Sequence, residues 1–278
     1  MRGDVYQIEL DYEGYDLEAP ATPAKLRPYL LNRPEGEYLF PKRPAVIVCP
    51  GGAYEHLSPR EGEPIALACN GAGFHAFVLQ YSIRPMRFPG ALLELSKAVA
   101  WVRAHAEEFG IDEHRIVVAG FSAGGHLAAS LGVFWKEGFV RRYLGFDGEE
   151  NRPDALLLAY PVISGREELV HAGSRLALLG KYPDERELSL FSLEDHVSDA
   201  TPPAFLWHTA ADDAVPAGNS LVFAQALAAH DIPYELHIYP HGGHGLGLAN
   251  LLTARFVGQI EQECQGWFSL AARFIETL

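Results

Sequence analysis

The sequence predicts an α/β fold in which a mostly parallel sheet carries helices on both faces. Short runs of β-branched and apolar residues alternate along the chain with longer segments of helical periodicity, and this alternation is typical of parallel strands joined by crossover helices. No internal repeat, low-complexity tract or linker interrupts it, and 278 residues are compatible with one large domain. We therefore expect residues 1–278 to form a single domain.

The expected strands and helices follow one another in a regular order. Residues 1–43 contain an alternating apolar pattern at 4–10 and a short candidate strand at 37–40, which we expect to be edge strands joined by a loop. Residues 44–49 are almost continuously apolar, as in a strand at the centre of a parallel sheet. Further strands are expected at 74–81, 116–119, 154–160, 203–208 and 234–239, and helices at 58–71, 90–109, from 126 onwards, at 167–179 and at 218–229, with one or two more within 249–277.

Local signals refine this order. Ser58, Pro59 and Glu61 have the spacing of a helix start, with a serine cap, a proline at the first helical position and a glutamate that closes a capping box. Residues 134–153 and 180–200 are irregular excursions that are too short for a large lid domain, and we expect them to shape a pocket.

Composition and charge restrict the classes of partner. The formal net charge of −14 argues against nucleic acid and anionic membranes, while it is compatible with a small neutral substrate. Residues 1–10 lack the apolar core of a signal peptide, and no run has the length of a transmembrane helix. Cys49, Cys69 and Cys264 are scattered in apolar surroundings, which fits a reducing compartment. We expect a cytoplasmic protein, with self-association into a homo-oligomer left open.

The motif Gly120-Phe121-Ser122-Ala123-Gly124 is the strongest chemical signal in the chain. A buried strand precedes it and a helical segment follows, which is the context of a nucleophile elbow. Glycines on either side allow close backbone approach, and Ser122 would stand at a helix N-terminus that favours negative charge. The alternative is a glycine- and serine-rich loop without chemical function.

A serine nucleophile needs a base and an acid, each expected in a loop after a later strand. The acid candidates are Asp212 and Asp213, of which we favour Asp212; an acidic loop at a helix entry is the alternative. The base candidates are His244 and His241, and the flanking glycines favour His244. A two-histidine metal site is the rival interpretation, disfavoured because no third ligand shares this spacing. We expect no cofactor.

An oxyanion hole requires backbone N–H groups directed at the substrate carbonyl oxygen. Ala123, directly after the serine, is one expected donor, and the loop after residues 44–49 offers the amides of Gly52 and Ala53. A tight structural turn is the alternative for that loop. The neighbouring Tyr54 is a candidate substrate-binding residue.

Other polar and aromatic residues are expected to have structural roles. His126 is expected to pack or bond beneath the serine turn, and His208 to be buried with its hydrogen bonds satisfied. Glu94 and Arg84 could form a structural ion pair. Trp101 and Trp207 are expected in the core.

Several of these motifs together resemble the α/β-hydrolase superfamily, and within it the small acetyl-xylan-esterase-like carboxylesterases related to hormone-sensitive lipase. They are residues 46–54, 60–66, 110–116, 120–128 and 207–216. The resemblance implies an eight-stranded sheet with one antiparallel strand and a triad of Ser122, Asp212 and His244. The chain departs from many relatives in having Pro50 where they have histidine and Ala53 in place of a third glycine, which affects the choice of the oxyanion donors.

The resemblance also implies the reaction class. We expect a serine carboxylesterase that hydrolyses short-chain acyl esters through an acyl-enzyme, with acetylated carbohydrates such as xylan oligosaccharides as substrates. The alternatives are a prolyl-peptidase-like amidase, an arylformamidase-type hydrolase and a non-catalytic scaffold used for binding.

Overall fold

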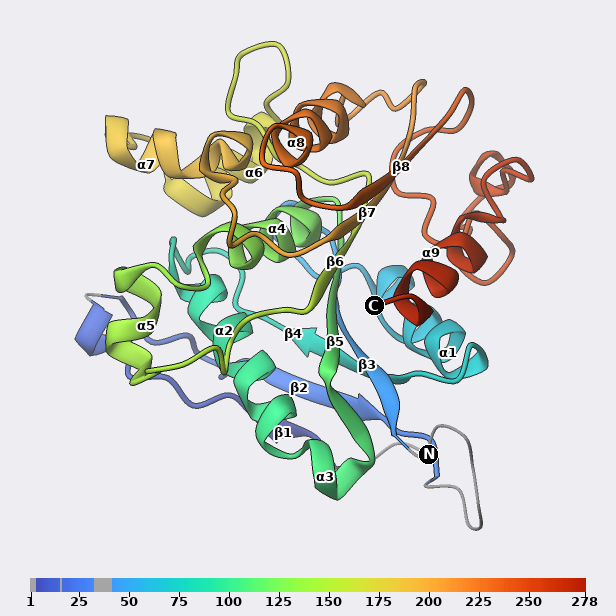
Figure 1. The fold of residues 1–278 in the computed structure, drawn as a ribbon. Coiled ribbons are helices and arrows are strands. Elements are labelled where there is room, and N and C mark those ends of the chain that lie inside the picture. Colours follow the sequence, from blue (N-terminus) through green and yellow to red (C-terminus); the bar gives the residue numbers. More distant parts are fainter. Residues whose placement is uncertain (1–3, 16, 33–41) are drawn as a thin grey trace.

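The computed structural model describes residues 4–15, 17–32 and 42–278. The short strand expected at residues 37–40 lies outside these ranges. The described residues form one sheet with helices packed on both of its faces (Figure 1).

The sheet has eight strands in the order β1-β2-β4-β3-β5-β6-β7-β8. β2 pairs antiparallel with both β1 and β4, while all other neighbouring strands pair in parallel. The expected mostly parallel, eight-stranded sheet with one antiparallel strand is thus confirmed. The strands are β1 (Tyr6–Gln7), β2 (Lys25–Tyr29), β3 (Arg43–Cys49), β4 (His75–Gln80), β5 (Ile111–Phe121), β6 (Ala155–Ala159), β7 (Ala204–Thr209) and β8 (Tyr234–Tyr239).

The antiparallel strand β2 lies at Lys25–Tyr29, within the part of residues 1–43 that was expected to be loop, and it contains Pro28. β1 covers only Leu26 and Lys25 of β2, so the part of β2 that contains Pro28 lies at an edge of the sheet. A proline is tolerated there, since an edge position need not supply every ladder hydrogen bond. The strand is anchored by the buried side chains of Leu26 and Tyr29.

The α-helices largely follow the expected periodicity but differ at their ends and in the excursions. The helix expected over 90–109 is divided at His105, and the helix after Ser122 begins directly at Ala123. Residues 134–153 contain α5, so this excursion is not wholly irregular. Residues 180–200 contain α7, whose start is a capping box formed by Asp184 and Glu187. The helices are α1 (Glu63–Gly71), α2 (Gly90–Ala104), α3 (Ala106–Phe109), α4 (Ala123–Phe134), α5 (Gly138–Leu144), α6 (Ala172–Leu179), α7 (Glu185–Phe191), α8 (Gly218–Ala229) and α9 (Trp267–Glu276), with 3-10 turns η1 (Glu13–Tyr15), η2 (Pro59–Glu61), η3 (Leu193–His196) and η4 (Val257–Gln259).

The capping box expected at Ser58 is not formed. Ser58 makes no side-chain cap hydrogen bond, and Pro59 opens the short 3-10 turn η2. α1 starts only at Glu63 after Gly62. Glu61 is buried because its carboxyl group bonds to groups far away in the sequence, as described below.

Two apolar cores lie on opposite faces of the sheet. Ile47 of β3 packs in the core shared with α2, α4 and α8, whereas its neighbours Val46 and Val48 pack in the core shared with α1 and α9. This alternation follows from the period of two along a strand. Figure 1 shows α1 and α9 on one side of the sheet and α2 and α4 on the other.

Candidate active site

Ser122 lies at a sharp turn between β5 and α4. Its backbone has φ 53° and ψ −119°, an uncommon and strained conformation for a residue with a side chain. A Cβ atom on Gly120 would lie 2.2 Å from the carbonyl oxygen of Gly124, and a Cβ on Gly124 would lie 2.1 Å from that of Cys49. Both positions therefore require glycine, because backbone atoms occupy the space of a side chain.

His244 joins Ser122 to Asp212. Its Nε2 atom lies 2.7 Å from Ser122 Oγ, and its Nδ1 atom lies 2.7 Å from Asp212 Oδ2. A carboxylate can only accept, so Nδ1 carries the proton and Nε2 accepts from the serine hydroxyl. The ring is thus in the tautomer that can take a proton from Ser122.

Asp212 is held by four hydrogen bonds. Oδ1 accepts the backbone N–H groups of Ala214 at 3.0 Å and Val215 at 2.9 Å, and Oδ2 accepts from His208 at 3.2 Å as well as from His244. The side chain is only 1% exposed. Burial by itself would raise the pKa of Asp212, but the bonds from His208 and His244 outweigh it and hold the pKa below its usual range. The carboxylate therefore stays ionised at neutral pH.

His208 is buried and satisfied, as expected, and one of its partners is Asp212. Its Nε2 atom lies 3.2 Å from Asp212 Oδ2 and 2.9 Å from the Val215 carbonyl oxygen, and its Nδ1 atom lies 2.8 Å from Ser220 Oγ. Two acceptors face Nε2, so this nitrogen carries the proton and Nδ1 accepts from Ser220. His208 and His244 therefore both donate to the same oxygen of Asp212, Oδ2.

The competing residues lie elsewhere. Asp213 is exposed, and the His241 side chain is 70% exposed and pairs with Glu263 at 3.2 Å. The structure thus brings Ser122, Asp212 and His244 together and leaves the other two candidates at the surface. Within residues 4–15, 17–32 and 42–278, no three His, Cys, Asp or Glu side chains gather as a metal site would require.

The loop after β3 packs against the serine turn. A Cβ atom on Gly51 would lie 3.0 Å from Ser122 Cβ, and the next residues include Ala53 and Tyr54 with φ 57° and 58°. In the described part of the chain, the backbone N–H groups of Gly52, Ala53 and Ala123 donate to no protein acceptor. Ala123 also opens α4, where the helix dipole favours negative charge. The three expected donors are therefore not engaged by a protein acceptor in the described ranges, and their role in an oxyanion hole stays a prediction.

Tyr54 and His126 form a buried pair beneath this loop. The Tyr54 side chain is 2% exposed, and its hydroxyl donates to His126 Nδ1 at 3.0 Å. His126 Nε2 donates to the Phe191 carbonyl oxygen at 3.2 Å. Burial lowers the pKa of His126 to about 4, so the ring is neutral. Contact of Tyr54 with substrate stays a prediction.

The expected ion pair between Glu94 and Arg84 is wrong. Glu94 instead accepts from the Tyr12 hydroxyl at 2.7 Å and from the backbone N–H of Ser82 at 2.7 Å. Arg84 lies 3.5 Å from Glu55 at the surface. Buried Glu94 is satisfied by neutral donors, so it needs no cation.

Of the two tryptophans expected in the core, Trp207 is fully buried and Trp101 is partly buried.

Sequence reasoning missed Glu61 and Tyr160 as parts of the site. Glu61 Oε2 accepts the backbone N–H of Gly51 at 3.0 Å, and Oε1 accepts the Tyr160 hydroxyl at 2.7 Å. The Tyr160 ring packs edge-on against His244, with 5.2 Å between ring centroids. The local pattern gives no sign of this role, because Glu61 has the spacing of a helix-start glutamate and its partner Tyr160 is 99 residues away.

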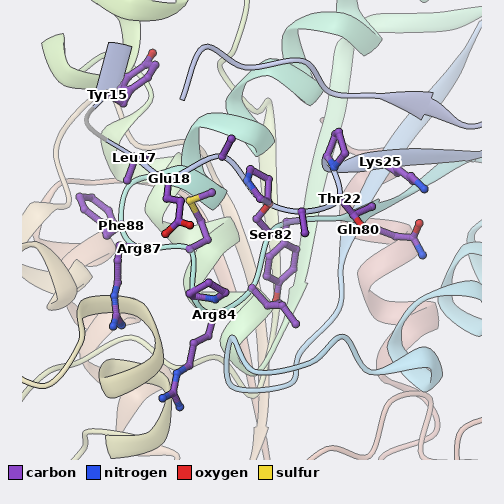
Figure 2. Close-up of a pocket in the computed structure, with 18 of the residues that line it drawn as sticks. Tyr15, Leu17, Glu18, Thr22, Lys25, Gln80, Ser82, Arg84, Arg87 and Phe88 are labelled. Atoms are coloured by element: carbon purple, nitrogen blue, oxygen red, sulfur yellow. The ribbon is translucent and has the colours of Figure 1, made fainter. Parts of the chain in front are cut away.

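A separate cavity of about 1170 Å³ lies between the N-terminal segment and the loop after β4. Figure 2 shows Leu17, Phe88 and Arg87 at one end of it, Thr22, Lys25 and Gln80 at the other, and Ser82 and Arg84 between them. Neither Ser122 nor its two partners line this cavity. Of the two excursions, 180–200 contributes Glu187 to its wall and 134–153 contributes no lining residue; their part in shaping the substrate site stays a prediction.

The family of this chain follows from its similarity to known proteins. The BD-FAE family model matches residues 37–227, which include Ser122 and Asp212. The chain belongs to the BD-FAE family of α/β-hydrolases. The resemblance stated from the sequence motifs is confirmed. None of the helices that the structure describes is both long and apolar enough to span a membrane.

Two proteins with solved structures match this BD-FAE chain over nearly its whole length. An acetyl ester-xyloside bifunctional hydrolase from Caldicellulosiruptor lactoaceticus is 38% identical, with a TM-score of 0.83, covering 99% of this chain and 96% of the other. A carboxylesterase from Lactobacillus plantarum WCFS1 is 30% identical, also with a TM-score of 0.83, covering 99% and 98%. The α/β-hydrolase fold and the grouping with carboxylic ester hydrolases are thus confirmed.

Curated relatives are longer than this chain. Endo-1,4-beta-xylanase B of Butyrivibrio fibrisolvens is 41% identical over 218 residues, which are 75% of this chain and 33% of that protein. An acetylxylan esterase of Xylanibacter ruminicola is 29% identical over 232 residues, 82% of this chain and 45% of that protein. The chain therefore spans less than half the length of these two relatives.

Proposed function

We propose that this chain is a serine carboxylesterase that removes short acyl groups, above all acetyl groups, from carbohydrate esters. The observation that carries the proposal is the continuous chain of hydrogen bonds from Ser122 through His244 to Asp212, with 2.7 Å at each of the two contacts of the ring. A serine at a strained turn, a histidine in the accepting tautomer and an ionised, buried aspartate are the parts of a nucleophilic triad.

In the acylation step, Ser122 Oγ attacks the carbonyl carbon of the ester. Its proton passes to His244 Nε2, and the resulting imidazolium is stabilised by Asp212. The tetrahedral intermediate then collapses, the C–O bond to the alcohol breaks, and His244 returns the proton to the leaving alkoxide. In the second half, His244 takes a proton from water as the water oxygen attacks the acyl carbonyl carbon. The bond between that carbon and Ser122 Oγ then breaks, His244 returns the proton to Oγ, and the carboxylic acid leaves.

The carbonyl oxygen becomes negatively charged in both halves of the reaction. We assign its stabilisation to the amides of Ala123, Gly52 and Ala53, which have no acceptor in the described part of the protein. Such donors are worth about 3–4 kcal/mol each when they are fixed in place. Tyr54 supports this loop from below through His126.

The substrate class is inferred from the relatives. A similar solved structure is an acetyl ester-xyloside bifunctional hydrolase and a similar curated protein is an acetylxylan esterase. Both names point to acetyl groups on xylose-based carbohydrates, and the net charge of −14 is compatible with such neutral substrates.

Initial rates on matched substrates test the proposal. We expect the highest kcat/KM among p-nitrophenyl esters for acetate, a decline through butyrate to octanoate, and release of acetate from acetylated xylo-oligosaccharides. If an aryl formamide or an aminoacyl p-nitroanilide is hydrolysed faster than every ester, the protein is an arylformamidase-type hydrolase or a prolyl-peptidase-like amidase and not an esterase. Absence of turnover on every ester would favour a binding scaffold.

A further inference from the structure

One buried carboxyl group connects two loops of the site that are far apart in the sequence. Glu61 is 3% exposed. Its Oε2 accepts the backbone N–H of Gly51 in the loop after β3, and its Oε1 accepts the hydroxyl of Tyr160. The same hydroxyl oxygen accepts the backbone N–H of Gly247, three residues after His244, at 2.8 Å. We call residues 50–54 the oxyanion loop and residues 240–247 the histidine loop. The side chains of Glu61 and Tyr160 thus connect the backbones of these two loops.

Tyr160 is held firmly in this position. It follows β6 with φ 37°, a strained value for an aromatic residue, and its backbone N–H donates to the Trp207 carbonyl oxygen at 2.8 Å. Its ring lies edge-on against the ring of His244. Burial, together with the nearby Glu61, raises the pKa of Tyr160 well above its ordinary value. The hydroxyl therefore keeps its proton at neutral pH and donates it to Glu61.

Arg60, the residue before Glu61, makes two further hydrogen bonds to the segment that follows His244. Arg60 Nη1 donates to the carbonyl oxygens of Gly245 at 2.9 Å and Thr253 at 2.7 Å. Two consecutive residues of η2 thus reach the segment that follows His244, one directly and one through Tyr160. Each of these bonds joins η2 to backbone that follows His244.

We propose that Glu61 and Tyr160 are positioning residues that hold the oxyanion loop and the histidine loop in register across Ser122. The inference rests on the function proposed above. A reacting ester must meet the amide donors and His244 at once, and these belong to separate loops after β3 and β8. A relative shift of about 1 Å between such groups is enough to slow catalysis by about 100-fold. The Glu61–Tyr160 bond removes that freedom without either side chain contacting the ester.

Tyr160→Phe tests the bond while keeping the ring against His244. We expect kcat on p-nitrophenyl acetate to fall about 10- to 100-fold, with KM changed less than about two-fold, because alignment for the reaction is lost rather than binding. Tyr12→Phe is the matched control, since Tyr12 donates to the buried carboxyl group of Glu94 at the same distance of 2.7 Å, away from the site. Tyr160→Phe also removes the acceptor of the Gly247 N–H, so it should lose more stability than Tyr12→Phe, but only Tyr160→Phe should lose kcat. Equal kcat in the two variants overturns the proposal.

Glu61→Gln and Glu61→Ala separate hydrogen bonding from mere filling of space. The glutamine oxygen can accept from Gly51 while its NH₂ group donates to the Tyr160 oxygen, which keeps the connection but leaves the Tyr160 hydroxyl proton without its Glu61 acceptor; this variant should therefore lose less kcat than Glu61→Ala. Glu61→Ala should lose at least as much as Tyr160→Phe, and combining these two should cost no more than Glu61→Ala alone because both break one connection. Additive losses contradict a shared role.

A readout independent of turnover separates this proposal from the proposed function. In ¹⁵N spectra, the ring nitrogens of His244 should shift in Tyr160→Phe and stay unchanged in Tyr12→Phe. A wild-type protein that is inactive on all esters overturns the esterase proposal, and the histidine signals still decide the positioning. Unchanged His244 signals in Tyr160→Phe overturn the positioning role.

Discussion

Asp212 Oδ2 lies 2.7 Å from His244 Nδ1. The other carboxylate oxygen of Asp212, Oδ1, accepts the backbone N–H groups of Ala214 and Val215. The backbone therefore fixes the orientation of the aspartate, and the aspartate fixes the tautomer of the histidine. Asp212 is thereby distinguished from Asp213, its exposed neighbour.

Asp212→Asn should lower kcat by about 10³- to 10⁴-fold. If the amide NH₂ faces His244, the proton moves to Nε2, and the ring can no longer accept from Ser122. Asp213→Asn is the control: it removes the same charge one residue away and should keep kcat within about two-fold, as is usual for exposed residues without partners. Steady-state kinetics of both variants checks this pair. A larger loss in Asp213→Asn than in Asp212→Asn contradicts the assignment of the acid.

The buried His126 makes stability depend on pH. Its pKa is lowered from 6.5 to about 4 in the folded protein, so the unfolded chain binds the proton first as pH falls. The contribution of His126 to the free energy of unfolding is therefore fully present above pH 6.5 and declines as pH falls towards 4. Between pH 7 and pH 5 this group should account for about 2 kcal/mol.

Denaturant unfolding of wild type and His126→Gln at these two pH values measures that contribution. Glutamine does not titrate, and it can still accept from Tyr54 and donate to Phe191. The variant should therefore lose less stability between pH 7 and pH 5 than wild type does. Parallel losses in the two proteins would exclude His126 as the source.

Gly124→Ala should damage both stability and activity. Its new Cβ would lie 2.1 Å from the Cys49 carbonyl oxygen and 2.5 Å from that of Pro50, so the serine turn and the oxyanion loop must move apart. We expect a loss of about 1–3 kcal/mol, as in other overpacked sites, with kcat lowered further than stability alone explains.

Gly71→Ala serves as the control for this change. Gly71 is the last residue of α1, and a Cβ there meets no atom within 4 Å. The substitution should raise the melting temperature or leave it unchanged, because alanine restricts the unfolded chain more than glycine does. A Gly124→Ala protein with the kcat of Gly71→Ala would show that the close approach at the turn is not required.

The sequence was sufficient for the parts of the molecule that depend on local pattern and chain order. The strand before Gly120, the glycines around Ser122 and the helix after it define the turn within a few residues. Asp212 and His244 follow later strands, and the C-terminal ends of neighbouring parallel strands lie at one edge of a sheet (Figure 1). The candidate site was predictable because each of its parts comes directly after a strand.

The sequence was insufficient where a distant partner decides the structure. Glu61 has the spacing of a helix cap, yet its carboxyl group bonds to Gly51 and Tyr160; a local motif does not reveal a partner 99 residues away. β2 contains Pro28, whose tolerance depends on an edge that only the assembled sheet defines. The environment of Glu94 likewise depends on Tyr12, which belongs to another part of the chain.

Labelling with a fluorophosphonate tests the central claim most directly, because the reagent requires a serine activated by its histidine. The wild-type protein should gain one phosphonyl group, mapped by peptide mass spectrometry to Ser122, and lose its activity on p-nitrophenyl acetate in step. Ser122→Ala should remain folded, take up no label and hydrolyse the ester at least about 10⁴-fold more slowly. Labelling at another residue, or ester turnover retained by Ser122→Ala, would contradict the account.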